Sequence, residues 1–267
     1  MINQAGSSQA GSRIHKTFAQ TKLENRAAFV GYLPAGFPTR EAFLTHASKL
    51  LEFADLLEIG LPYSDPLGDG PTIQKASEVA IHGGMTVKGT FEQAAALRER
   101  TDKPLCIMTY YNPILSYGEE AFVSSAIAAG VDGLILPDLP PDEADTLIPL
   151  AREAGLALTF LLAPTSTTER IKVVAAATTG FIYAVSVTGV TGARAAVPVE
   201  VPTLVANIKA HTDTPVAVGF GVADRATAHG IAAVADGVVV GSALVTTAGR
   251  GESLEALSRE ILEGCSR

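Results

Sequence analysis

Short, continuously apolar runs alternate along this chain with longer stretches whose apolar residues recur every three or four positions. Runs such as LILP at 134–137 and GVVV at 237–240 lack the alternation of a half-exposed strand. They are typical of strands buried on both faces, as in a parallel sheet covered by helices. The pattern predicts eight strands, over residues 28–33, 56–60, 104–109, 133–136, 157–162, 181–185, 215–219 and 237–240.

The intervals between these strands have helical periodicity. The predicted helices span 13–22, 39–53, 86–98, 119–129, 142–154, 168–177, 201–211, 223–234 and 253–262. We interpret Asp142 and Ser253 as N-caps, because each stands just before a helical stretch. Gly130 and Gly155 each follow a predicted helix, as residues that end helices often do.

Eight strand–helix units use the whole length from residue 13 to 267 and leave none for a second domain. They predict a single (β/α)8 TIM barrel, here with a short N-terminal helix before it. The structural alternative is an open, doubly wound sheet, but LPAGFP follows the first strand where that fold carries GxGxxG. Residues 1–12 are polar and rich in Gly, Ser and Gln, so we expect a disordered leader there.

The composition argues against several classes of function. Hydrophobic residues make up 47% of the 267 residues, enough for a large core, and the net charge of −8 argues against nucleic acid or an anionic membrane as a partner. Two distant cysteines and five scattered histidines offer neither a disulfide framework nor metal-ligand spacing. No apolar run is long enough to span a membrane, and no signal peptide is evident, so a cytoplasmic protein is expected.

The most informative segment is LLEIGLPYSDPLGDGPTIQ at 56–74. Glu58 interrupts an otherwise apolar strand, where desolvation should raise its pKa into the range useful for acid–base catalysis. The alternative is a structural glutamate in a salt bridge. Asp65 and Asp69 follow in a loop whose prolines and glycines give it a defined shape; such aspartates often serve as turn formers.

Glycines follow the last three strands, in SVTGVTG at 186–192, GFG at 219–221 and GS at 241–242, where a short helical turn is expected to begin. Glycine lets backbone N–H groups approach an oxyanion, and a helix N-terminus adds a favourable dipole. Three such loops at neighbouring strand ends predict a phosphate site, which is recurrent in this fold. Tight turns alone are the other interpretation.

Four aromatic residues lie at or near the carboxyl ends of their strands: Tyr32, Tyr110, Tyr183 and Phe220. Each singly fits a core position. Together they predict a flat apolar pocket for an aromatic substrate.

These segments, with GYLPAGFP at 31–38, GVDGLILPDLPPDEA at 130–144 and VVVGSALV at 238–245, resemble the α subunit of tryptophan synthase. The resemblance is collinear from about residue 13 to the C-terminus. The string from Pro62 to Gln74 is highly specific, whereas the glycine loops alone fit many phosphate-binding barrels.

The resemblance implies a lyase that cleaves indole-3-glycerol phosphate to indole and glyceraldehyde 3-phosphate in tryptophan biosynthesis. Glu58 and Asp69 match the family's catalytic pair: Glu58 would protonate indole C3, and Asp69 would accept a hydrogen bond from the indole N–H. No metal or organic cofactor is implied.

Other family positions carry over by the same match. Phosphate contacts, mainly through backbone N–H groups, fall on Gly192, Gly221, Gly241 and Ser242. Thr191 matches the threonine of a mobile loop that holds Asp69, and Asp65 matches a residue that signals to the partner subunit. The remaining substrate-binding positions form the pocket wall: Tyr32, Tyr110, Ile135, Leu161, Tyr183 and Phe220.

The family also implies a pyridoxal-phosphate β subunit as partner, in a heterotetramer of two α and two β subunits. Three alternatives stay open. One is a stand-alone indole-3-glycerol-phosphate lyase. Another is a different phosphate-binding barrel enzyme such as an isomerase or aldolase, although no lysine stands at a strand carboxyl end to form a Schiff base. The third is a non-catalytic scaffold, which would need neither Glu58 nor Asp69.

Overall fold

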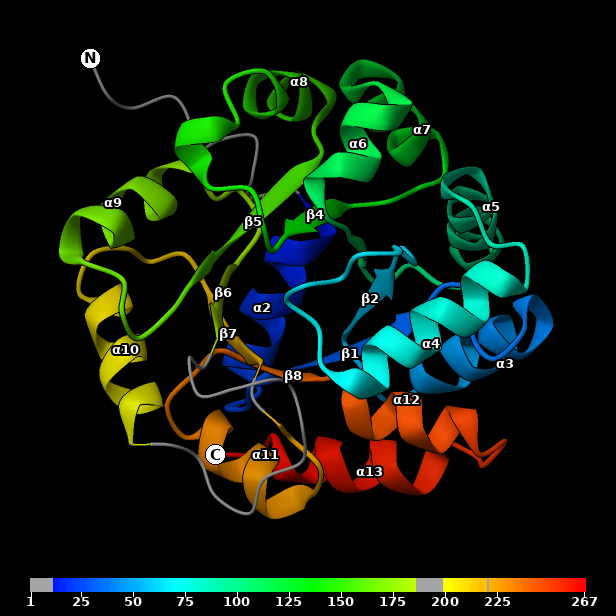
Figure 1. The fold of residues 1–267 in the computed structure, drawn as a ribbon. Coiled ribbons are helices and arrows are strands. Elements are labelled where there is room, and N and C mark those ends of the chain that lie inside the picture. The colour runs from blue at the N-terminus through cyan, green and yellow to red at the C-terminus, as the bar shows by residue number, and fades with distance from the viewer. Residues whose placement is uncertain (1–11, 186–198, 220) are drawn as a thin grey trace.

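The computed structural model describes residues 12–185, 199–219 and 221–267, and its strands form a closed barrel. All neighbouring strands are parallel, and β8 pairs with β1 to close the ring (Figure 1). The eight predicted strands are confirmed, each within one residue at either end. They are β1 (Ala28–Pro34), β2 (Leu56–Gly60), β3 (Leu105–Met108), β4 (Gly133–Leu136), β5 (Ala157–Leu162), β6 (Ile182–Val185), β7 (Val216–Gly219) and β8 (Gly237–Val240).

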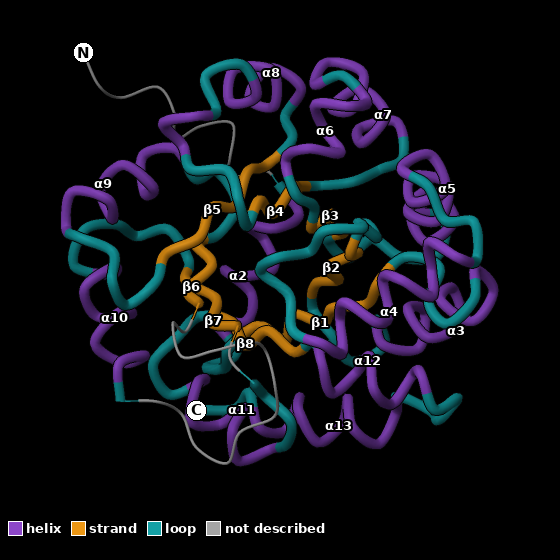
Figure 2. Tube along the Cα trace, viewed as in Figure 1, coloured by secondary structure: helices purple, strands orange, loops and turns teal. Residues whose placement is uncertain are grey.

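Helices surround the strands in an outer ring (Figure 2). Those that match predicted helices are α2 (Arg13–Leu23), α3 (Arg40–Leu50), α5 (Val87–Arg98), α7 (Glu119–Ala128), α8 (Leu147–Ala154), α9 (Thr168–Ala177), α10 (Glu200–Lys209), α11 (Arg225–Ala232) and α13 (Glu255–Gly264). The short helical turn expected after β8 is α12 (Ser242–Gly249). Among the described residues, no helix has the length and apolar character that crossing a membrane requires.

Two helices were not predicted, and both lie at the strand ends that carry the loops of interest. They are α4 (Pro71–His82) and α6 (Tyr111–Tyr117). Pro71 occupies the first turn of α4, where its fixed φ suits a helix start and its missing N–H costs nothing. Helix α6 is only 7 residues long and contains Pro113, so its sequence carries little periodicity.

Both predicted N-caps are wrong. Asp142 lies in a separate 3-10 turn, η1 (Pro141–Glu143), and pairs with Arg170 on the surface, while α8 begins later. Ser253 stands two residues before α13; its hydroxyl accepts the Glu255 N–H at 3.3 Å, and Leu254 occupies the cap position. The helix-ending role of Gly155 is confirmed, since it takes the left-handed conformation with φ of 72°.

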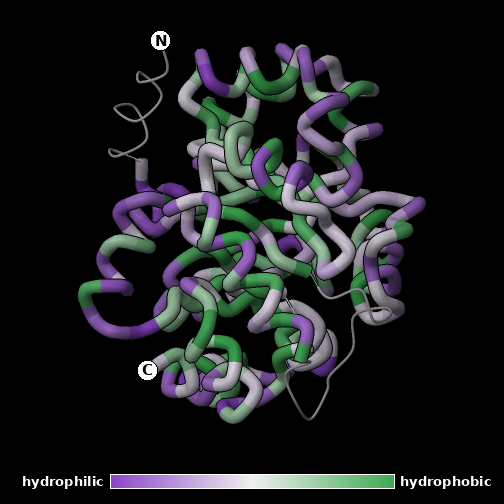
Figure 3. The backbone as a smooth tube through the Cα atoms, turned by 90° about the vertical axis from the view of Figure 1, so that its left-hand side faces the viewer, coloured by the Kyte–Doolittle hydropathy of each residue, from purple (hydrophilic) through white to green (hydrophobic). Residues whose placement is uncertain are grey.

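Hydrophobic segments of the chain run through the middle of the molecule (Figure 3). Their side chains form two cores. One lies between the strands and the surrounding helices, and the other fills the barrel interior. Ile14 and Phe18 of α2 close the interior at the end where the strands begin, and the rings of Phe18 and Phe181 are 5.5 Å apart. Since side chains alternate along a strand, Glu58 shares the inward face of β2 with Leu56 and lies nearer the opposite, carboxyl end.

Four residues that precede the even-numbered strands tie the strand starts together. Each donates its backbone N–H to a carbonyl of the preceding odd-numbered strand at 2.8–2.9 Å. The side-chain oxygen of each then accepts the N–H of that same strand residue at 2.8–2.9 Å. These residues are Asp55, Asp132, Thr179 and Asp236. The three aspartates also pair with cations, Arg26, Arg98 and Lys209 respectively.

We expect Asp132→Ala to lower the free energy of unfolding by about 2–4 kcal/mol, because it leaves a half-buried Arg98 and the Leu105 N–H without their acceptor. Urea denaturation at unchanged m-value measures the loss. Asp142→Ala is the matched control, since it removes an exposed aspartate that also pairs with an arginine. Equal midpoint shifts in the two variants would contradict the structural role of Asp132.

Candidate active site

Glu58 lies inside the barrel with no exposed surface. It is in register with Tyr32 of β1 and Cys106 of β3. Among the described residues neither carboxyl oxygen has a hydrogen-bond partner, and no cation stands within 4.0 Å, which excludes a salt bridge with any of them. Burial raises the pKa of Glu58 to about 8. The carboxyl group therefore holds a proton at neutral pH.

Asp69 lies in the loop between β2 and α4 and is 8% exposed. The cap of α4 is Gly70, and no side chain caps this helix, so the Asp69 carboxylate is not a turn or cap acceptor there. Burial raises the pKa of Asp69 to about 6, while a hydrogen bond from Tyr110 lowers it. At neutral pH this group is mostly ionised, in contrast to Glu58.

Tyr110 fixes the loop that carries Asp69. Its hydroxyl donates to the Asp69 side chain and accepts the Gly68 N–H at 2.9 Å. Tyr63 of the same loop packs on Tyr110 with ring centroids 5.4 Å apart. Tyr110 thus holds the loop between β2 and α4 against the end of β3.

Tyr32 and Tyr183 lie beside both carboxyl groups. Burial raises the pKa of each phenol well above its usual range, and the negative charges of Glu58 and Asp69 raise both further. The two carboxyl groups therefore share the same pair of tyrosine neighbours. Each ring occupies space that a facing glycine leaves: a Cβ at Gly60 would stand 2.2 Å from the Tyr32 hydroxyl, and one at Gly219 would stand 2.4 Å from that of Tyr183.

Two further predicted wall residues face the same interior. Ile135 of β4 is buried in the interior core, and Leu161 of β5 packs against that core while keeping some exposure. With the tyrosines they give the carboxyl pair an apolar surround.

The predicted phosphate residues that the structure describes lie at the ends of β7 and β8. Gly221 follows β7 with φ of 43°, a conformation that favours glycine. Gly241 caps α12, and Ser242 is its first residue, so the first N–H groups of that helix have no partner within the helix. The Cα of Gly241 faces the ring of Tyr32, since a Cβ there would lie 3.6 Å from it. Thr191, Gly192 and Phe220 lie outside the described residues.

Asp65 takes a different position from the other predicted residues. It is exposed on the β2–α4 loop, where the Ser64 hydroxyl donates to its carboxylate at 3.0 Å. Leu67, two residues on, is 91% exposed. This outer part of the loop faces solvent while Asp69 is buried.

Sequence reasoning missed Gln74 as a site-positioning residue. Its side-chain amide donates to the backbone carbonyl of Asp69 at 2.9 Å from the first turn of α4. Its place four residues after the cap, Gly70, would have indicated this contact had α4 been predicted.

Comparisons with known proteins decide the family. A family model described as tryptophan synthase alpha chain matches residues 18–264. The chain belongs to the tryptophan synthase alpha chain family. Members of this family are lyases that cleave indole-3-glycerol phosphate in tryptophan biosynthesis, so an isomerase, an aldolase or a scaffold no longer fits.

Relatives of the same name cover nearly the whole chain. The tryptophan synthase alpha chain of Deinococcus radiodurans is 52% identical over 256 residues, 96% of this chain and 95% of that protein. The Mycobacterium marinum protein is 46% identical over 255 residues, 95% of this chain and 94% of that protein. A solved structure of Mycobacterium tuberculosis tryptophan synthase is similar with a TM-score of 0.90 at 44% identity, covering 96% of this chain and 99% of that chain.

Proposed function

We propose that Glu58 and Asp69 perform the cleavage of indole-3-glycerol phosphate in this chain, releasing indole and glyceraldehyde 3-phosphate. The observation that carries the proposal is two buried carboxyl groups of different pKa among the same tyrosines. Environments that separate the pKa values of two acids assign them different roles.

The reaction needs an acid first. The bond between indole C3 and the glycerol chain breaks only after C3 is protonated, because the ring carbon is otherwise a poor leaving group. Glu58, with a pKa of about 8, holds the proton to be delivered. As the bond breaks, the adjacent glycerol hydroxyl becomes the aldehyde and gives up its proton, which returns to Glu58 directly or through water. Glu58 therefore ends the reaction protonated, as it began.

The protonated indole ring carries a positive charge that needs an anion nearby. Asp69, with a pKa of about 6, supplies one at neutral pH and accepts the indole N–H. The aromatic ring fits the apolar wall that includes Ile135, Leu161 and the tyrosines.

The phosphate end fits the glycine turns after β7 and β8. The free N–H groups at the start of α12 and the backbone of Gly221 offer donors to an oxyanion, with the helix dipole adding to the attraction. Because Gly241 faces Tyr32, this end of the site is close enough to the pocket for one small substrate to reach both.

We also propose a β subunit of tryptophan synthase as partner, in an assembly of two α and two β subunits in the cytoplasm. Support comes from the relatives described as tryptophan synthase and from the exposed Leu67 beside Asp65. A partner that covers this loop would contact Asp65 and lie next to Asp69. Asp65 is therefore the residue that couples the partner to the active site. Full turnover without any β subunit would instead favour a stand-alone lyase.

The direct test incubates the purified chain with indole-3-glycerol phosphate and follows indole, with and without an added β subunit. Asp69→Asn is expected to lose about 10²-fold in turnover, since it removes the anion that stabilises the protonated ring. Asp145→Asn, at an exposed position, is the matched control. Similar rates for the two variants would remove Asp69 from the mechanism.

Tyr110→Phe should move the acid side of the pH–rate profile. The hydroxyl lowers the pKa of Asp69 by donating to it, so its loss raises that pKa further and shifts the acid limb of kcat/KM to higher pH. A decrease of about 10-fold near pH 6 is expected, as for one hydrogen bond to a charged group. Tyr117→Phe, on α6, is the control. An unshifted limb with reduced kcat would mean that Tyr110 acts only through packing.

A further inference from the structure

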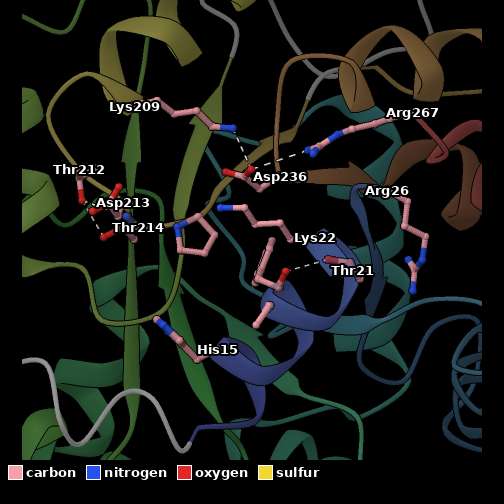
Figure 4. Close-up of a pocket in the computed structure, with 13 residues that line it drawn as sticks. His15, Thr21, Lys22, Arg26, Lys209, Thr212, Asp213, Thr214, Asp236 and Arg267 are labelled. Atoms are coloured by element: carbon pink, nitrogen blue, oxygen red, sulfur yellow. Dashed lines mark hydrogen bonds and ion pairs between the residues drawn. The ribbon is translucent and has the colours of Figure 1, made fainter. Parts of the chain in front are cut away.

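A cavity of about 300 Å³ lies where the barrel strands begin (Figure 4). Glu58 lies nearer the other end of the barrel. The cavity lies between α2 and the residues that precede β7 and β8, among them Pro215 and Asp236. Figure 4 shows α2 on one side and the loop containing Thr212, Asp213 and Thr214 on the other. The cavity shares no lining residue with the proposed active site.

Cationic side chains outnumber anionic ones in the cavity lining. Four Lys or Arg side chains and two aspartates line it, and Arg26 is already paired with Asp55 and Glu24, which lie outside the lining. Asp236 is already engaged by Lys209 at 2.8 Å and by Arg267 at 3.8 Å. Its negative charge is therefore compensated before any ligand enters.

Lys22 supplies the available charge. Among the described residues no carboxylate lies within 4.0 Å of its ammonium group, and no hydrogen bond engages it. Figure 4 shows this ammonium directed into the space beside Asp236. Asp213, on the loop across the cavity, is exposed. An anion entering beside Lys22 would meet an unpaired cation.

Part of the cavity lining is apolar. Phe18, Ala19 and Pro215 contribute to its lining, and Phe18 is held in place against Phe181 in the barrel interior. The volume of about 300 Å³ lies at the lower end for small-molecule sites. A ligand with one anionic group and a compact apolar body fits both features.

We propose that this cavity binds a small organic anion, with Lys22 facing its carboxylate or phosphate and Phe18 and Pro215 contacting its apolar part. The site is separate from the proposed active site. Failure of either proposal therefore leaves the other standing.

The test is an NMR titration of the full chain with benzoate, phenyl phosphate and the uncharged benzamide, with glycerol phosphate present to occupy the substrate's phosphate site. Saturable shifts are expected in the amides of α2 and of residues 212–215, and benzamide should bind about 10-fold or more weakly than benzoate. The relative affinities of benzoate and phenyl phosphate distinguish a carboxylate from a phosphate ligand.

Two variants locate the charge. Lys22→Gln should weaken benzoate binding about 10-fold, whereas Lys88→Gln, which removes an exposed lysine of α5, should leave it unchanged. The proposal is overturned by any of three results: no saturable shifts in α2, benzamide binding as tightly as benzoate, or Lys22→Gln binding as tightly as the unmodified chain.

Discussion

Glu58→Gln is expected to reduce indole release by about 10³–10⁴-fold, the upper part of the range for removing a general acid. Glutamine keeps the size and shape of the side chain but has no proton to give to indole C3. The carboxyl group is fully buried, and no other acid takes its position in register between Tyr32 and Cys106. Steady-state indole formation measures the loss.

Measuring the binding of glycerol phosphate distinguishes a loss of catalysis from a loss of folding in this experiment. The affinity for glycerol phosphate should stay the same, because the proposed phosphate donors at Gly221 and at the start of α12 follow other strands, β7 and β8. Glu41→Gln, at an exposed position of α3, controls for loss of a charge. If Glu58→Gln retained near-normal turnover, the proposed acid would be wrong, whatever the fold.

The burial of Glu58 could be predicted from the sequence because the signal is local. A charged residue in an apolar strand is buried whichever element packs on it, and strand alternation places it on the face of Leu56. Asp69 was harder, because a carboxylate among prolines and glycines fits a turn equally well. Its hydrogen-bond partner Tyr110 comes 41 residues later in the chain, so only the three-dimensional structure shows that Asp69 is a buried group beside this tyrosine.

The missed elements have a different cause. Helix α4 follows a loop so rich in proline and glycine that the turn signals extend over its first residues, and α6 is too short for periodicity to appear. Asp142 and Ser253 carry cap chemistry, yet Asp142 pairs with Arg170, a partner 28 residues away. Local propensity does not reveal such partners.

The hydrogen bonds between neighbouring strand starts could not be predicted from local sequence either. Asp55, Asp132 and Asp236 appear in the sequence as ordinary residues before apolar runs. Their role depends on the neighbouring odd-numbered strand, whose N–H each accepts, and Thr179 fills the equivalent place with a hydroxyl. Their fourfold recurrence is visible only once the barrel closes.

The stability of Glu58→Gln relative to the unmodified chain should increase as the pH rises. The carboxyl group has a pKa of about 8 in the folded chain against 4.5 as its ordinary value, so the unfolded chain loses its proton first. Stability is therefore undiminished below pH 4.5, falls as the pH rises through this interval, and levels off above pH 8. Between pH 6 and 8.5 the unmodified chain should lose about 2–3 kcal/mol relative to the variant.

This pH dependence isolates the cost of ionising Glu58 from other effects of the substitution. A glutamine amide without partners in the same place costs about 1–3 kcal/mol, but equally at every pH. Asp69 titrates in both proteins and cancels in the difference. Urea midpoints of Glu58→Gln, Glu41→Gln and the unmodified chain at pH 6 and pH 8.5 give the comparison. A difference between Glu58→Gln and the unmodified chain that stays constant over this range would show that Glu58 ionises as readily in the fold as in the unfolded chain. A raised pKa would then no longer account for its proton at neutral pH, whereas a growing difference would mean that the fold gives up stability to keep an acid beside the substrate.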